Sequence, residues 1–202
     1  HRLEARRQQI LTDRKRKKKV QNTEDNQVFG RQLYETGLRE LRGGNSEKAA
    51  KTFKMAVTYD PSMEEYKTLR DEVSRQAETD RSRRLAARAE DELDMGFAAT
   101  AARRFAEAAD LMPTMGSYAV RASQAFMAAG DVDMAAEYAD RAVASSPNRQ
   151  EFRLAAAAAF QAAGQPEIAR EHLVAVASLD AEDDRAKEML RDLDASMSRK
   201  RS

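Results

Sequence analysis

The chain of 202 residues is long enough for one or two domains with a substantial core. It contains no Cys, which excludes a disulfide framework, a thiolate zinc site and a Cys nucleophile. Its net charge of +1 hides an asymmetry, because residues 1–20 carry a net +7 and the remaining residues a net −6. Charged side chains make up 34% and apolar ones 42%, many of them Ala, which favours helices that pack through small residues. No apolar run approaches the roughly 20 residues of a membrane helix, so we expect no membrane insertion.

Residues 1–20 predict a basic helical segment that ends in six consecutive cations at positions 14–19. These like charges repel one another, so the stretch is either solvated or paired with something acidic. Nucleic acid is disfavoured as a partner, because no stacking aromatic residues are interleaved, and it stays an option only through residues 1–20. Residues 21–29 are polar and turn-prone, and they predict a linker into the first hairpin.

A period of 34 residues organises most of the remaining chain. The positions that repeat with this step are Gly96, Gly130 and Gly164, then Ala101, Ala135 and Ala169, and finally Pro113 and Pro147. A fixed period of this size is typical of a stack of helical hairpins, in which each unit buries its apolar face against its neighbours. The residues before Pro61 follow the same internal pattern. We therefore expect helical hairpins over residues 30–60, 82–112, 116–146 and 150–180.

In this pattern the chain resembles the tetratricopeptide repeat (TPR) family, with units at 30–63, 82–115, 116–149 and 150–183. The family motif places Gly early in helix A and Gly at the turn, then Ala, an aromatic residue, Ala and a closing Pro. This chain lacks the early Trp throughout and has the early Gly only as Gly37; its fourth unit has Val176 for the late Ala and Ala181 for the Pro. The resemblance implies an all-α, right-handed superhelical stack of hairpins. Small residues such as Gly130 and Ala135 would then allow the backbones of neighbouring helices to approach one another.

We expect four segments along the chain: a basic helical segment and linker over 1–29, the first hairpin plus an extra helix over 30–81, a three-repeat array over 82–183, and a capping helix with a tail over 184–202. A predicted capping box at residues 62–65 starts the extra helix near Met63. This helix either continues for about 30 residues or breaks at Thr79 and Asp80. A continuous helix would allow a homodimer through residues 62–94. Asp180 and Asp183 are expected to cap the last helix, from about Ala181 to Ser198.

The motifs that carry catalytic chemistry are missing from this sequence. The sequence has no Gly-rich phosphate loop, no paired-His metal spacing and no nucleophile elbow. His172 is expected to be a surface or partly packed imidazole. The acidic side chains of residues 90–94 fan around a helix axis and predict a solvated face rather than a cation site. We therefore expect neither an enzyme nor a bound cofactor or metal.

The TPR resemblance also implies where a partner would bind. In that family helix A lines a concave groove, and the family's clamp for chaperone C-terminal carboxylates uses Lys and Asn at its fifth and ninth positions. Those positions hold Ala86 and Glu90 in the second unit and Val120 and Gln124 in the third. Exposed aliphatic residues there suit a peptide or helix with aliphatic anchors, unless the end helix or residues 62–80 fill the groove. The predicted groove residues are Tyr34, Leu38, Arg42, Glu90, Val120, Gln124, Met127, Leu154 and Gln161.

A second resemblance concerns residues 10–19, which are similar to the closing segment of a J domain. There a Leu-Ser-Asp turn, here Leu11, Thr12 and Asp13, precedes a Lys/Arg-rich helix. Arg14 stands where that family has Pro, and the His-Pro-Asp motif of J domains is absent from this sequence. The leading hypothesis is a cytoplasmic, non-catalytic scaffold or adaptor that binds a protein or peptide. The alternative is the partner- or client-binding C-terminal part of a J-domain co-chaperone.

Overall fold

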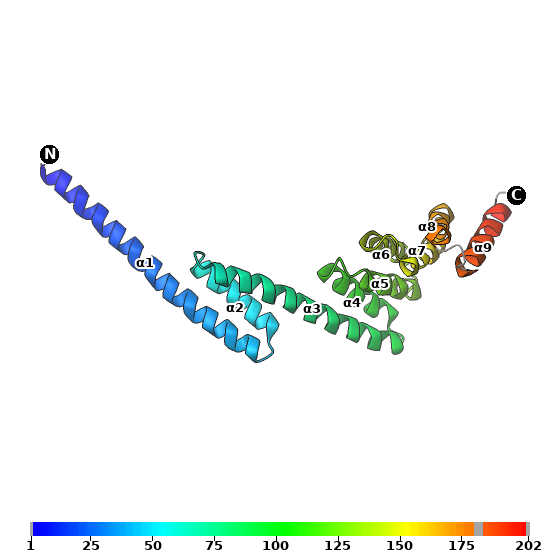
Figure 1. Ribbon diagram of the computed structural model, residues 1–202, viewed down its shortest axis with the longest axis horizontal. Helices are drawn as coiled ribbons and strands as arrows, with labels where there is room; N and C mark the ends of the chain where they lie inside the picture. Colours follow the sequence, from blue (N-terminus) through cyan, green and yellow to red (C-terminus); the bar gives the residue numbers. More distant parts are fainter. Residues whose placement is uncertain (1, 180–183, 201–202) are drawn as a thin grey trace. The chain divides into compact units, whose positions relative to one another are not determined.

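A computed structural model describes residues 2–179 and 184–200, with side chains described from residue 8 to residue 199 outside that gap (Figure 1). The described residues form nine α-helices and no strand, which confirms the predicted all-α class. The chain divides into two compact units, His1–Asp80 and Arg81–Ser202. The boundary between the units falls inside the third helix.

The first unit is a helical hairpin with a third helix packed on it. It contains α1 (Arg2–Arg42), α2 (Ser46–Tyr59) and the beginning of α3 (Glu64–Asp94). Its core is formed by Ala49, Phe53 and Val73, with Leu38 and Leu69 partly buried around them. Gly37 makes this packing possible, since a Cβ atom there would lie 2.7 Å from Cε1 of Phe53.

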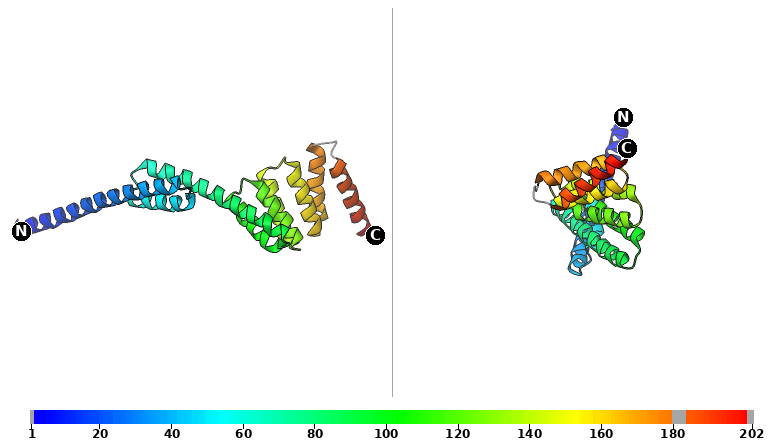
Figure 2. Two further views of the ribbon diagram at one scale, coloured as in Figure 1. Left: turned by 90° about the horizontal axis from the view of Figure 1, so that it is seen from below. Right: turned by 90° about the vertical axis from the view of Figure 1, so that its right-hand side faces the viewer.

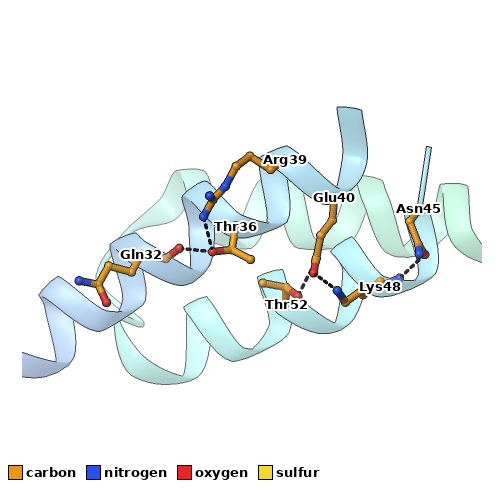
Figure 3. A network of polar contacts seen from close by, with 7 residues as sticks. All are labelled: Gln32, Thr36, Arg39, Glu40, Asn45, Lys48 and Thr52. Atoms are coloured by element: carbon orange, nitrogen blue, oxygen red, sulfur yellow. Dashed lines mark hydrogen bonds and ion pairs between the residues drawn. The ribbon is translucent and has the colours of Figure 1, made fainter. Parts of the chain in front are cut away.

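Polar contacts also hold the two helices of this hairpin together (Figure 3). Glu40 of α1 accepts a hydrogen bond from the Thr52 hydroxyl of α2 at 2.6 Å and pairs with the Lys48 ammonium at 3.0 Å. The hydrogen bond from Thr52, reinforced by Lys48, lowers the pKa of Glu40 despite its partial desolvation. Asn45 caps α2, because its Oδ1 accepts from the Lys48 amide at 3.1 Å.

The structure differs from the sequence-based expectation at residues 21–29, which are helical rather than a linker. Their polar side chains satisfy one another along α1: the Gln21 amide donates to Asp25 at 3.0 Å, and the Thr23 hydroxyl donates to the Lys19 carbonyl at 2.9 Å. Without a Gly or Pro before Gly30, nothing interrupts the helical backbone. Turn-prone composition is therefore not sufficient to end an exposed helix.

The extra helix α3 is continuous from Glu64 to Asp94, so of the two alternatives the unbroken one is correct. Gln76 donates to Asp80 at 2.9 Å across the proposed break, and the Thr79 hydroxyl donates to the Arg75 carbonyl at 2.8 Å. The predicted capping box is wrong, because the Ser62 amide, from which the Glu65 side chain would have to accept a hydrogen bond, donates to Asp60 at 3.2 Å instead. A homodimer through residues 62–94 stays a prediction.

The second unit is a stack of helical hairpins in which successive helices lie side by side (Figure 2). The remainder of α3 is followed by α4 (Ala98–Leu111), α5 (Gly116–Ala128), α6 (Val132–Ser145), α7 (Gln150–Ala162), α8 (Pro166–Leu179) and α9 (Asp184–Lys200). The main core is dominated by Ala, with Phe105, Phe126, Tyr138 and Phe152 as its large side chains. This arrangement confirms the predicted solenoid of hairpins.

The repeated glycines form the hairpin turns. Gly44, Gly96, Gly130 and Gly164 all have positive φ angles, between 72° and 84°. At each turn the Gly amide donates to the carbonyl three residues earlier, and the following amide donates to the carbonyl five residues earlier. This is the Schellman arrangement that closes a helix C-terminus. The expected close backbone approach at Gly130 is wrong, since a Cβ atom there would meet nothing within 4 Å.

Ala135, in contrast, fits the expected tight packing, because it is fully buried in the main core. We expect Ala135→Leu to lower the free energy of unfolding by about 1–3 kcal/mol through overpacking. Lys187→Ala is the control: this side chain makes only a 3.5 Å ion pair with the exposed Asp184. Chemical denaturation of both variants measures the difference, and equal midpoints would contradict the assigned packing.

The last helix, α9, covers the open end of the stack as predicted. Leu193 is buried against Ala157, Ala169 and Leu173, and Met189 packs beside it. The predicted beginning of this helix at Ala181 and its caps at residues 180 and 183 lie outside the described residues. The capping helix leaves a polar outer face, which a repeat stack needs at its end.

Candidate partner-binding groove

The second unit carries an open groove of about 600 Å³ between α5, α7 and α9. It is lined by Ser123, Gln124 and Met127 from α5, by Gln150, Glu151, Leu154, Ala155 and Ala158 from α7, and by Arg185 and Met189 from α9. The α7 residues recur at helical spacings of three and four, so they share one face of that helix. The first helices of two hairpins, α5 and α7, thus form one concave surface together with the capping helix α9.

The groove combines aliphatic walls, small residues and a polar border. Met127, Leu154 and Met189 are partly buried and contribute the apolar walls, while Ala155 and Ala158 leave room between them. Glu151 pairs with Arg149 at 3.1 Å. Arg185, exposed near the beginning of α9, places a cation at the border. Such a surface suits a ligand with aliphatic anchors.

Of the predicted groove residues in this unit, Gln124, Met127 and Leu154 line the groove and three others do not. Gln161 is exposed on α7 but lies outside the lining. Glu90 is engaged by Arg121, whose Nε donates to it at 2.8 Å. Val120 was expected to be exposed, but it is only 3% exposed and belongs to the main core. The reason is that α5 is packed against α4, α6 and α7, which leaves little of its surface free.

Two of the three predicted groove residues of the first unit, Tyr34 and Leu38, serve its own packing. Leu38 lies against the Phe53 cluster, and Arg42 is exposed at the end of α1. Tyr34 stacks on Tyr66 with ring centroids 4.6 Å apart and donates to Glu65 at 2.6 Å. This hydrogen bond, together with burial, raises the pKa of Tyr34 to about 12. Tyr34 also borders a separate hollow of about 560 Å³ on the first unit.

Sequence reasoning missed the contribution of α9 to the groove. The apolar face of this helix predicts that it caps the stack, but not which of its residues approach α7. The period of the repeats ends before α9, so no equivalent residue in an earlier unit indicates its register. Arg185 and Met189 were therefore not recognised. The end helix borders the groove rather than filling it.

His172 is an ionisable group inside the last hairpin. Only 9% of it is exposed, its ring stacks on Phe160 at 5.6 Å, and its Nδ1 has no hydrogen-bond partner in the described structure. Burial lowers its pKa, and the charge of Arg153 lowers it further, while Asp140 and Glu171 oppose the shift. The neutral imidazole is therefore the form that the fold accommodates.

We expect the free energy of unfolding to decrease as the pH falls through the range just below about 6.5, the ordinary pKa of His. In that range the unfolded chain binds a proton that folded His172 does not, so protonation favours unfolding. His172→Gln should flatten this dependence between about pH 7.5 and 5, above the ordinary carboxylate range. Urea denaturation across this range measures it, and an unchanged slope in the variant would contradict the assignment.

The described residues contain no group of three or more His, Asp or Glu side chains that could hold a metal ion. None of their helices combines the length and the apolar character that a membrane crossing requires.

Comparison with known structures defines the class of fold. No protein-family model matches the sequence, and a comparison with curated proteins finds no match. The first TPR of Spaghetti (RPAP3), bound to an HSP90 peptide, is 17% identical with a TM-score of 0.54, over 59% of this chain and 95% of that one. The Yersinia enterocolitica type III secretion chaperone SycD, in complex with a peptide of the translocator YopD, is 17% identical with a TM-score of 0.50, over 57% and 93%. MamA is 15% identical with a TM-score of 0.51, over 80% and 84%. The fold is therefore that of tetratricopeptide repeats.

Proposed function

We propose that this protein is a non-catalytic interaction scaffold that binds a peptide or a helix in the groove of α5, α7 and α9. The observation that carries the proposal is the groove itself, whose aliphatic walls are open because α9 borders it without filling it. Two of the similar structures hold peptides, which supports the use of this fold for peptide binding. Exposed apolar surface of this kind commonly marks an interaction site.

The lining predicts the chemistry of the ligand. Met127, Leu154 and Met189 favour aliphatic anchor residues, and flexible Met side chains can adapt to different partners. Gln124 and Gln150 supply amide groups for backbone hydrogen bonds. Arg185 is the cation of the lining, so a ligand with one acidic group near its end would match the border. We do not expect the first helices of the hairpins to form a clamp for a terminal carboxylate.

No comparable observation supports the co-chaperone alternative. The J-domain resemblance implies a turn at Leu11, Thr12 and Asp13, whereas α1 is uninterrupted there. The Thr12 hydroxyl donates to the Gln8 carbonyl at 2.9 Å, as it does inside a regular helix. The scaffold is therefore the function that we retain.

Ala158→Arg tests the proposal by filling the groove. Ala144→Arg is the matched control, because Ala144 is exposed on α6 and does not line the groove. The probes are peptides selected from a random library on the unmodified protein. We expect Ala158→Arg to weaken their binding at least about tenfold, which corresponds to about 1.4 kcal/mol, and Ala144→Arg to leave it unchanged. Equal binding by both folded variants, checked by circular dichroism, would contradict the proposal.

A further inference from the structure

Residues 8–29 of α1 form an exposed helix, whose contact with the rest of the first unit lies at its end, where the Phe29 and Tyr59 rings are 4.6 Å apart. Every side chain in this range is exposed, and the next residue, Gly30, is buried. The segment extends beyond the hairpin formed by α1 and α2 (Figures 1 and 2). It therefore contributes little to the core of the first unit, and its surface is free to contact another molecule.

The charge on this segment surrounds the helix instead of marking one face. Residues 14–19 are Arg, Lys, Arg, Lys, Lys and Lys, and among the described residues none of them forms an ion pair, although Asp13 borders the same hollow as Arg16 and Lys17. Successive residues are rotated by about 100° around a helix axis, so these six cations cover the whole circumference. The nearby carboxylates are Asp13, Glu24 and Asp25, and the last accepts a hydrogen bond from Gln21.

The arrangement of these cations around the helix distinguishes between the possible kinds of partner. A membrane surface or a flat acidic protein surface contacts one face of a helix, and a membrane helix needs an apolar stripe opposite its cations. Ile10, Leu11 and Val20 lie at different angles around the axis. The other exposed apolar residues, Val28 and Phe29, lie at the hairpin end of the segment, so no continuous apolar stripe lies opposite the cations. Cations on every face instead match a ligand that encloses the helix with negative charge on two sides.

We propose that residues 8–29 of α1 bind double-stranded DNA, with the helix lying in the major groove between the two phosphate backbones. That groove is about 12 Å wide and admits an α-helix. The absence of aromatic residues argued against nucleic acid in the sequence, but stacking aromatics serve single strands and are not needed for phosphate contacts in a duplex. The A-form groove of double-stranded RNA is too narrow for this mode.

The binding rests on phosphate contacts, so it is sequence-independent and depends on salt. Six contacts predict a slope of about −5 in a plot of log affinity against log salt, or a loss of about 10³-fold between 50 and 200 mM. Outside residues 1–20 the chain carries a net −6, which opposes binding of DNA elsewhere. We therefore place the contacts on the basic helix.

Two triple variants of the full chain test both sides of the helix. One replaces Arg14, Lys17 and Lys18 by Gln, and the other replaces Lys15, Arg16 and Lys19, which lie on the opposite face. A control replaces Arg42, Lys51 and Lys54 by Gln, exposed cations of the same unit without a described ion pair. The probe is a fluorescent DNA duplex of about three helical turns, measured by anisotropy at several salt concentrations.

We expect each triple variant to lose at least about tenfold in affinity and to reduce the slope to about −3, while the control binds as the unmodified protein does. Circular dichroism confirms that the variants remain helical. The proposal is overturned if the duplex is not bound at 50 mM salt, if only one face matters, or if the control loses as much. It is also overturned if single-stranded DNA, poly-glutamate or anionic lipid vesicles bind the chain as tightly as the duplex.

Discussion

Phe105→Ala is expected to lower the free energy of unfolding by about 3–5 kcal/mol. Phe105 is 1% exposed in the main core of the second unit, where the surrounding side chains are mostly Ala. Such small neighbours have few atoms that could move into the space left by the ring, so the cavity should persist. The Arg121 guanidinium, 5.4 Å from the ring centroid, also loses a contact. Urea denaturation measures the change.

Phe97→Ala is the matched control for this loss. Phe97 is 60% exposed at the turn before α4, and its side chain makes no capping hydrogen bond. We expect its removal to change the free energy of unfolding by less than about 0.5 kcal/mol. If the two Phe→Ala variants were equally stable, the described core of the second unit would be wrong.

The second large effect is expected at Gly116, the first residue of α5. A Cβ atom there would lie 2.6 Å from Cε2 of Phe152 and 3.1 Å from the carbonyl oxygen of Ala142. A backbone carbonyl cannot move aside cheaply, so Gly116→Ala should cost near the upper end of about 1–3 kcal/mol. Thermal and urea unfolding both report this loss.

Gly43→Ala provides the comparison, because it makes the same substitution where there is space. A Cβ atom at Gly43 would make only ordinary contacts, at 3.4 Å and 3.5 Å, and its φ angle is not positive. Because Ala restricts the unfolded chain more than Gly does, Gly43→Ala should raise the free energy of unfolding by about 0.4–1 kcal/mol. A destabilised Gly43→Ala beside a neutral Gly116→Ala would reverse the assigned packing.

The architecture could be predicted because its determinants are local and repeated. Each hairpin needs a residue that tolerates positive φ at its turn and small residues where its helices meet. Gly130 and Ala135 meet these two needs, and their equivalents recur every 34 residues. The sequence did not distinguish the two roles, so the steric reason given for Gly130 was wrong while that for Ala135 fits its complete burial.

The groove was less predictable, because exposure depends on how each helix is rotated against its neighbours. Val120 and Gln124 lie one turn apart on α5, yet Val120 is buried and Gln124 is exposed. The repeat period gives their positions in the helix but not the identity of the surfaces packed against them. The contribution of Met189 to the groove could not be predicted either. Because α9 belongs to no repeat, the period does not indicate how this helix is rotated against its neighbours.

The central claim, that a ligand occupies the groove of α5, α7 and α9, is tested most directly by nuclear magnetic resonance of the Met methyl groups. The chain has nine Met residues, two of which, Met127 and Met189, line the groove. Titration with a library-selected peptide should shift these two methyl signals and leave those of Met55 and Met95, exposed elsewhere, unchanged. Shifts at Met55 or Met95 with Met127 and Met189 unaffected would contradict the proposed site.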